Sequence, residues 1–256
     1  MQSFIQQVRK NPWLSLIFAV FSGGVVFYLS SYLGSLTNCW IKQFVALNFY
    51  TANVFMKGYM LLFSLLLILL VNKGSLRNYG FTKPEKLRYV RFFLISTGIL
   101  IGAFIFANLI FNGILRNIFP PESGKAGFPE TQSLLQRILT IWIWSSICEE
   151  VLTRGFIQGF MNKHINIRFL KLSLPVWISG LFFGLMHLSL LNINMDVWFI
   201  SFIVTNTTVI GLLAAYYREK TKSIYPAFFV HFWANVILTL PLIIMKFVSF
   251  NSICNT

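Results

Sequence analysis

Two adjacent glutamates and an arginine stand in a strongly apolar stretch, TIWIWSSICEEVLTRGFIQGF, residues 140–160. An acidic side chain at the centre of a bilayer costs about 2.5–3.5 kcal/mol, so this pair requires partners. Glu150 and Arg154 are four residues apart and share a helix face, which predicts an ion pair. Glu149 lies about 100° further round the helix and has no intrahelical cation. It is therefore predicted to remain free to titrate, accept a proton or hold a water molecule. The alternative is that both glutamates only pair with basic groups elsewhere.

Two of the three histidines lie in apolar segments and could complete a site. His187 ends the stretch FGLMH, with Phe183 one turn earlier on the same face, and His231 begins HFWAN, with Asn235 four residues later. A glutamate and a histidine can activate water as a general base. A second histidine and the asparagine amide can donate hydrogen bonds to a developing oxyanion. Glu149, His187, His231 and Asn235 therefore predict hydrolysis of an amide bond without a covalent intermediate.

A metal site is the competing chemistry. Glu149, His187 and His231 would make a catalytic zinc set with an open position. Asparagine is a poor zinc ligand, and a metalloprotease needs a further carboxylate as base, whereas Glu150 is expected to be occupied by Arg154. The residues therefore favour a reaction without a cofactor, with zinc as the runner-up.

Two other residues of reactive type are expected to have no catalytic role. Cys148 adjoins Glu149 but is interpreted as a small apolar filler, since the three cysteines form no CxxC pair. His164 lies in the basic segment MNKHINIR and is expected to need no special role.

The composition indicates what kind of chain positions these residues. Of 256 residues, 56% are hydrophobic and only 11% are charged, and the mean hydropathy is +0.70. Soluble domains carry roughly 25% charged residues, so the composition predicts an integral membrane protein. The net charge of +14 is assigned to membrane topology, because Lys and Arg collect in cytoplasmic loops. A nucleic-acid partner is not expected.

Apolar stretches of roughly 20 residues are long enough to cross a bilayer. They predict seven helices, at residues 13–36, 52–72, 92–113, 136–161, 172–191, 197–217 and 225–247. The fold class is therefore all-α, a polytopic membrane helix bundle with about seven transmembrane helices and eight as the alternative. The segment at 116–135, rich in proline and glycine, is predicted to be a loop. Gly23, Gly24 and Gly102 are expected to let helices pack closely.

The basic residues predict the orientation. Fourteen of the 21 Lys and Arg residues fall on one side of the seven-helix scheme, in residues 9–10, 73–91, 163–171 and 218–222. The other side receives six, of which Lys57 is expected to extend to the interface. Only Arg154 is left inside the membrane. The positive-inside rule then places the N-terminus in the cytoplasm and the C-terminus outside the cell membrane.

Counting along straight helices leaves one conflict. Measured from the basic loops, His231 lies shallow, Glu149 near the middle and His187 deeper. Tilt or a helix break at Pro175 or Pro226, or different boundaries for the fifth helix, must bring the three side chains together.

Three motifs stand in order on three predicted helices. EEVLTRG, residues 149–155, fits EExxxR; FGLMH, residues 183–187, fits FxxxH; and HFWAN, residues 231–235, fits HxxxN. Together with the approach GLLAAYYREKTKSIYPAFFV, they resemble the CPBP family of CAAX proteases and bacteriocin-processing enzymes, also called the Abi family. The N-terminal half resembles this family only in being helical and apolar. The predicted organisation is a single integral membrane domain, 1–256, with N-terminal helices at 1–130 and a catalytic core at 136–247.

The resemblance implies an intramembrane endopeptidase of the glutamate type. By motif position, Glu149 would be the base that activates water, with His187 assisting, and His231 and Asn235 would form the oxyanion site. Glu150 and Arg154 would be the supporting pair, and Phe183 a further supporting residue. Short loops and a Phe-rich composition suit a bacterial member, whose substrates would be small peptides or membrane-proximal segments, such as bacteriocin precursors. Prenylated CAAX substrates do not follow from the sequence.

Two other functions remain open for the same residues. The first is a membrane interaction protein without proteolysis, acting in bacteriocin immunity or as the signalling partner of a sensor kinase. The second is an ion-coupled transporter, since intramembrane Glu, Arg and His also mark ion paths. No inverted repeat is found in the sequence, which argues against the transporter.

Overall fold

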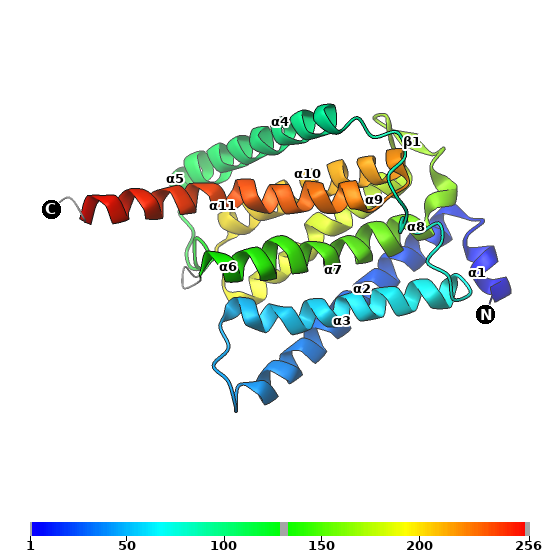
Figure 1. The fold of residues 1–256 in the computed structure, drawn as a ribbon, viewed down its shortest axis with the longest axis horizontal. Helices are drawn as coiled ribbons and strands as arrows, with labels where there is room; N and C mark the ends of the chain where they lie inside the picture. Colours follow the sequence, from blue (N-terminus) through cyan, green and yellow to red (C-terminus); the bar gives the residue numbers. More distant parts are fainter. Residues whose placement is uncertain (1, 129–132, 254–256) are drawn as a thin grey trace.

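The chain forms long helices that run alternately in opposite directions through one bundle (Figure 1). This computed structural model describes residues 2–128 and 133–253. Its α-helices are α1 (Gln2–Val8), α2 (Pro12–Ile41), α3 (Phe49–Val71), α4 (Tyr89–Ala107), α5 (Arg116–Ile118), α6 (Leu134–Arg137), α7 (Ser146–Glu150), α8 (Gln158–Phe160), α9 (Leu174–Leu185), α10 (Val197–Thr221) and α11 (Tyr225–Ile253). Two short antiparallel strands, β1 (Arg168–Phe169) and β2 (Leu172–Ser173), form the β-structure of the described residues.

Several of these elements join into longer helices. π-helical turns at Asn108–Leu115 connect α4 to α5, giving one helix from Tyr89 to Ile118. π-helical turns at Ile138–Ser145 and Val151–Ile157 connect α6, α7 and α8 into a second, which we call the central helix. In the fifth segment, α9 passes into the 3-10 helix η5 (Met186–Ile193).

The predicted all-α membrane bundle is confirmed. Within the described residues, five helices are long and apolar enough to cross a membrane, judged by length and composition. They are Pro12–Ile41, Thr51–Val71, Tyr89–Ile118, Leu174–Ile193 and Val197–Thr221. The stretch Tyr225–Leu240 is a shorter apolar helix. Each of the seven predicted spans thus falls on a helical segment, although the segment at 172–191 contains an α-helix only as far as Leu185.

The predicted loop at 116–135 is shorter than expected. Its first three residues belong to α5, and its residues 129–132 lie outside the described residues. Lys125 bonds through its backbone to Asn194 and Asp196, at 3.0 and 3.1 Å, so the loop is tied to the start of α10.

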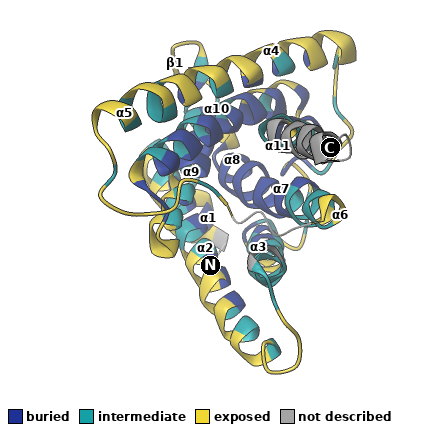
Figure 2. Ribbon diagram, turned by 90° about the vertical axis from the view of Figure 1, so that its left-hand side faces the viewer, coloured by how far each residue is buried: buried dark blue, intermediate teal, exposed yellow. Residues whose placement is uncertain are grey.

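The central helix occupies the middle of the bundle, and its residues 148–160 are buried throughout (Figure 2). On one side, its apolar residues pack with α2 and α3, through Leu152, Phe156 and Ile157 among others. A second apolar group joins α4, α9, α10 and α11 around Phe183. The outer faces of α2 and α4 carry exposed, large apolar side chains, as expected of surfaces that face lipid.

Polar residues fix where several helices begin. The Asn11 side chain accepts hydrogen bonds from the backbone of Trp13 and Leu14 and caps α2. Asp196 caps α10 in the same way, and its carboxylate also binds the Arg116 guanidinium with two contacts of 2.7 Å. Pro175 and Pro226 both stand in the first turn of their helices, where proline needs no hydrogen-bond partner. These prolines therefore break no helix, and this one of the alternatives for bringing the three side chains together does not apply.

Glycines allow close helix contacts, although not all at the predicted positions. A Cβ on Gly23 would lie 2.7 Å from the Ile157 side chain, so α2 contacts the central helix there as expected. Gly24 and Gly102 have nothing within 4 Å of a built Cβ, so the expectation for these two is wrong. Close packing also occurs between α9 and α10, where a Cβ on Gly211 would meet the Gly180 carbonyl oxygen at 2.7 Å.

His164 has more partners than its loop position suggested. It is buried, in the 3-10 turn Asn162–His164 that follows α8, and its Nε2 lies 3.1 Å from the Ser15 hydroxyl of α2. The Ser15 hydroxyl in turn donates to the Val8 carbonyl oxygen at 3.0 Å, so it accepts from His164. His164 thus joins the end of the central helix to the start of α2 through a hydrogen bond.

Candidate active site

Glu150 and Arg154 form the predicted ion pair in the middle of the bundle. Arg154 Nη1 lies 3.0 Å from Glu150 Oε1, and the two side chains are 0% and 1% exposed. Arg154 Nη2 donates to the Gly211 carbonyl oxygen of α10 at 2.8 Å. The guanidinium carbon also lies 4.6 Å from the centre of the Phe183 ring. Glycines at the α9–α10 contact make this possible, because they bring the α10 backbone within reach of Arg154.

Glu149 is also paired, which was not expected. Lys57 of α3 forms an ion pair with Glu149 Oε1, and the Ser145 hydroxyl donates to the same oxygen at 2.8 Å. Glu149 has no cation on its own helix, as predicted, but the expectation that it remains unpaired is wrong, and so is the expectation that Lys57 extends to the interface. Helical spacing identifies partners on the same helix only, whereas Lys57 comes from a neighbouring helix. Each glutamate therefore has a basic partner, Arg154 on the same helix for Glu150 and Lys57 on a neighbouring helix for Glu149.

His231 of α11 connects the two glutamates. Its Nδ1 lies 3.0 Å from Glu150 Oε1, and its Nε2 lies 3.5 Å from Glu149 Oε2. A carboxylate can only accept a hydrogen bond, so the contact with Glu150 assigns a proton to Nδ1. Nε2 then carries a second proton only in the imidazolium form. Glu150 Oε1 accepts from Arg154 and His231 together, which fixes the orientation of the imidazole ring.

His187 reaches the same site from η5. Its Nδ1 lies 2.9 Å from the Phe183 carbonyl oxygen, which leaves Nε2 without a proton in the neutral ring. The Phe183 ring stands between the two histidines, with ring centres 5.3 Å from His187 and 4.9 Å from His231. Glu149 and Lys57 are near enough to His187 to interact with it electrostatically. The boundary of α9 also differs from the predicted one: α9 ends at Leu185, so His187 stands in the 3-10 helix η5.

Asn235 lies one helical turn beyond His231 on α11 and contacts the central helix. Its Nδ2 donates to the Ser146 hydroxyl at 3.1 Å and to the Ile141 carbonyl oxygen at 3.4 Å. Both amide protons therefore have protein acceptors. To donate to a substrate oxygen, the amide must exchange one of these contacts for the new one.

One carboxylate oxygen of each glutamate has no hydrogen-bond donor among the described residues. Glu149 Oε2 and Glu150 Oε2 are buried and accept no hydrogen bond from the described residues. Glu149 Oε2 is the oxygen that faces His231, and the other oxygen holds Lys57 and Ser145. The carboxylate of Glu149 is thus held by one oxygen and presents the other.

Two observations bear on the zinc alternative. Across the described ranges, no three His, Cys, Asp or Glu side chains are grouped in a way that could hold a metal ion. The Lys57 ammonium already occupies Glu149, and a divalent cation beside it would be repelled. Cys148 is 0% exposed, which agrees with its interpretation as a small filler.

Three site residues were not identified in the sequence. Ser145 stands four residues before Glu149, so helical spacing could have indicated it. Ser146 could not be recognised without the position of Asn235, and Lys57 could not be assigned without the position of α3.

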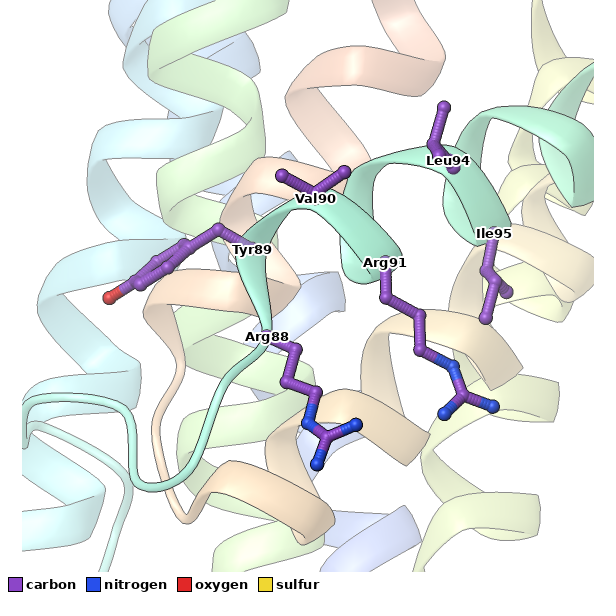
Figure 3. Close-up of a pocket in the computed structure, with 6 residues that line it drawn as sticks. All are labelled: Arg88, Tyr89, Val90, Arg91, Leu94 and Ile95. Carbon is purple, nitrogen blue, oxygen red and sulfur yellow. The ribbon is translucent and has the colours of Figure 1, made fainter.

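A surface hollow lies elsewhere, at the N-terminal end of α4. It has a volume of about 610 Å³ and is lined by exposed residues, with the Arg88 and Arg91 side chains pointing to one side of the helix (Figure 3). None of the predicted site residues lines it. The candidate site is therefore the buried cluster and not this hollow.

Comparison with known protein families identifies a similarity in the second half of the chain. Residues 131–237 match the family model described as type II CAAX prenyl endopeptidase Rce1-like. None of the curated proteins or solved structures with which the chain was compared matches it. The matched region contains all three motifs and excludes α2 and α3.

Proposed function

We propose that the chain is a membrane-embedded endopeptidase with Glu149 as its catalytic base, because residues 131–237 match the Rce1-like CAAX endopeptidases of the CPBP family. The substrate is a peptide or a membrane-protein segment that meets the enzyme in the bilayer. The observation that carries the proposal is the convergence of three motifs. Phe183 contacts Arg154, His187 and His231 at centre distances of 4.6, 5.3 and 4.9 Å.

The first step is attack by water on the scissile carbonyl carbon. Glu149 Oε2 takes a proton from the water, and the neutral His187 orients the water through the lone pair of Nε2. The new C–O bond forms as the carbonyl π electrons move to the carbonyl oxygen. The proton then passes from Glu149 to the leaving nitrogen as the C–N bond breaks, giving a carboxylic acid and an amine.

The negative carbonyl oxygen requires hydrogen-bond donors. His231 Nε2, in its imidazolium form, and Asn235 Nδ2 are the donors on α11, one helical turn apart. Glu150 supports them, because its Oε1 accepts from Nδ1 of His231 and from Arg154. On this assignment, Asn235→Ala lowers turnover about 10²–10³-fold and does not abolish it.

The deciding experiment compares Glu149→Gln with Glu122→Gln, a matched change at an exposed loop position. Wild type and both variants are purified in lipid and assayed for cleavage, and peptides that co-purify are identified by mass spectrometry. Glu149→Gln should lose cleavage, retain the fold and trap uncleaved substrate, while Glu122→Gln stays active. If Glu149→Gln instead keeps its full biological function, the protein acts as a membrane interaction protein without proteolysis.

The proposed reaction uses no cofactor. Activity should therefore survive treatment with a strong chelator followed by dialysis, with a known zinc protease as the positive control. Loss of activity that added zinc restores would make Glu149, His187 and His231 metal ligands.

A further inference from the structure

Lys57 reaches the candidate site from outside the family-matched region. It lies on α3, and its ammonium pairs with Glu149 Oε1. The lysine side chain is 12% exposed and the glutamate side chain 5%, so water screens the pair weakly. The match covers residues 131–237, so nothing in it assigns Lys57 a role.

The position of Lys57 along the central helix is fixed by its neighbours on α3. Trp144 of the central helix donates through its indole nitrogen to the Val54 carbonyl oxygen at 3.1 Å. A Cβ on Gly58 would lie in ordinary contact with the same indole, at 3.7 Å. These contacts, on either side of Lys57 in sequence, set the register that brings the ammonium to Glu149.

Helix α2 holds α3 from the opposite side. A Cβ on Gly34 would lie 2.8 Å from the backbone of Met56, the residue before Lys57, so the two helices touch there. Hydrogen bonds flank this contact. Asn38 Nδ2 donates to the Ala52 carbonyl oxygen at 3.0 Å, and the Thr37 hydroxyl lies 3.0 Å from that of Tyr59. Lys57 therefore stands on a segment that is packed on two faces.

The ion pair decides which oxygen of Glu149 is available. Oε1 holds Lys57 and the Ser145 hydroxyl. Oε2 accepts no hydrogen bond from the described residues and faces His231 Nε2 at 3.5 Å. A carboxylate held through one oxygen by two partners cannot rotate freely, so it presents the other oxygen in a fixed direction.

We propose that Lys57 is a positioning residue of the active site, through which the N-terminal helices complete a catalytic unit that the family-matched region does not contain alone. It holds Oε1 with Ser145 and stabilises the carboxylate form, so that Oε2 accepts the proton of the attacking water. When Oε2 gives this proton to the leaving nitrogen, the ion pair is restored and Lys57 itself is unchanged. This inference rests on the proposed role of Glu149 as base.

A pH profile separates this role from a purely structural pair. The charged or titratable groups that interact with Glu149 are Lys57 of α3, His187 of η5, His231 of α11, and Cys148, Glu150 and Arg154 of the central helix. Removing Lys57 leaves the other groups in place but takes away a full positive charge. The base must be ionised to act, so the acid limb of kcat/KM should move to higher pH, by about one to three units.

The experiment measures kcat and KM against pH for Lys57→Met, Lys57→Arg and the control Lys42→Met. Lys42 is an exposed lysine at the end of α2. Lys57→Met should lower kcat at neutral pH and shift the acid limb, with little change in KM. Lys57→Arg should keep the wild-type profile more closely, and Lys42→Met should equal wild type. An unshifted profile with wild-type kcat in Lys57→Met overturns the proposal.

Thermal unfolding supplies a readout that does not depend on cleavage. Lys57→Met strands a buried carboxylate and should lower the apparent Tm, whereas adding Glu149→Gln removes that charge and should restore most of the loss. If the Tm losses of the two single variants simply add in the double variant, Lys57 and Glu149 are not coupled. This result would overturn the positioning role of Lys57 but not the proposed role of Glu149 as base. A Glu149→Gln variant that still cleaves would overturn the proposed base, and the positioning role with it, while the coupling in Tm would still report the ion pair.

Discussion

At the scale of single residues, the buried charges of the central helix are matched. Glu149 pairs with Lys57, and Glu150 pairs with Arg154. Each carboxylate therefore has its own cation, in addition to any contact with a histidine. An isolated charge in this environment costs several kcal/mol, which explains why each is paired. The pairing separates two tasks, because one glutamate orients His231 and the other keeps an oxygen available.

Loss of one partner of the buried pair should destabilise the fold. Arg154→Ala leaves Glu150 as an uncompensated charge and also removes the contacts with Gly211 and Phe183. The expected loss is about 3–5 kcal/mol in the free energy of unfolding, measured by denaturation in detergent micelles. Arg168→Ala is the matched control, because its pair with Glu219 is half exposed and should contribute less than about 1 kcal/mol. Equal losses in the two variants would contradict a structural role for Arg154.

At the scale of the elements, the site depends on how closely α9 and α10 approach. Gly211 matters twice, because its carbonyl oxygen accepts from Arg154 and its missing side chain leaves room for the α9 backbone. Phe183 is carried by α9 at the same level, where a Cβ on Gly211 would come within 3.2 Å of its ring. Any separation of the two helices would therefore move Phe183 and Arg154 together.

Gly211→Ala tests this dependence. The added methyl group would lie 2.7 Å from the Gly180 carbonyl oxygen and 3.0 Å from its Cα, and backbone atoms cannot rotate away. We expect a loss of about 1–3 kcal/mol in stability, as for other overpacked contacts, together with reduced cleavage. Gly102→Ala is the control, since a methyl group there meets nothing within 4 Å. Tm values that fall equally for both would exclude a special role for the α9–α10 contact.

The junction of α2 with the end of the central helix should depend on pH. Burial lowers the pKa of His164 below its ordinary value of 6.5. Above about pH 6.5 the ring is neutral in both the folded and the unfolded chain. As the pH falls below that value, the unfolded chain takes up a proton that the folded chain does not, so stability is lost.

We therefore expect that, as the pH is lowered from 6.5 towards the pKa of His164 in the folded chain, the apparent Tm of wild type falls faster than that of His164→Gln. The glutamine keeps a donor for Ser15 but does not titrate, so the other histidines are common to both proteins. Parallel pH dependences would show that His164 does not control this junction.

At the scale of the whole molecule, hydropathy predicted where the helical segments lie, and the motifs predicted that Glu149, His187 and His231 lie close together. Bilayer thickness requires long apolar runs, so those segments are visible in sequence. The ion pair of Lys57 was not predicted, because it depends on the register between α3 and the central helix. The end of α9 at Leu185 was not predicted either, since the apolar run continues through η5 without a proline or glycine signal.

Because successive helices run in opposite directions, the loops fall into two sets at the two ends of the bundle, and the orientation in the membrane can be tested. The loops that carry fourteen basic residues lie at the end of the bundle where α1 begins, whereas α11 runs towards the opposite end (Figure 1). With Lys57 paired to Glu149 inside the bundle, five basic residues remain in the other set, namely Lys42, Arg116, Lys125, Arg137 and Lys246. The positive-inside rule then predicts that the end with fourteen faces the cytoplasm.

Cysteine labelling in intact cells decides between the two orientations. In a background without Cys39 and Cys254, Lys83→Cys places a thiol in the exposed loop before α4, and Ser123→Cys places one in the loop after α5. The first thiol should react only with a membrane-permeant reagent, because its loop lies in the cytoplasm. The second should react with an impermeant reagent added outside. The reversed pattern would invert the topology, and it would place the basic end of the bundle outside the cell.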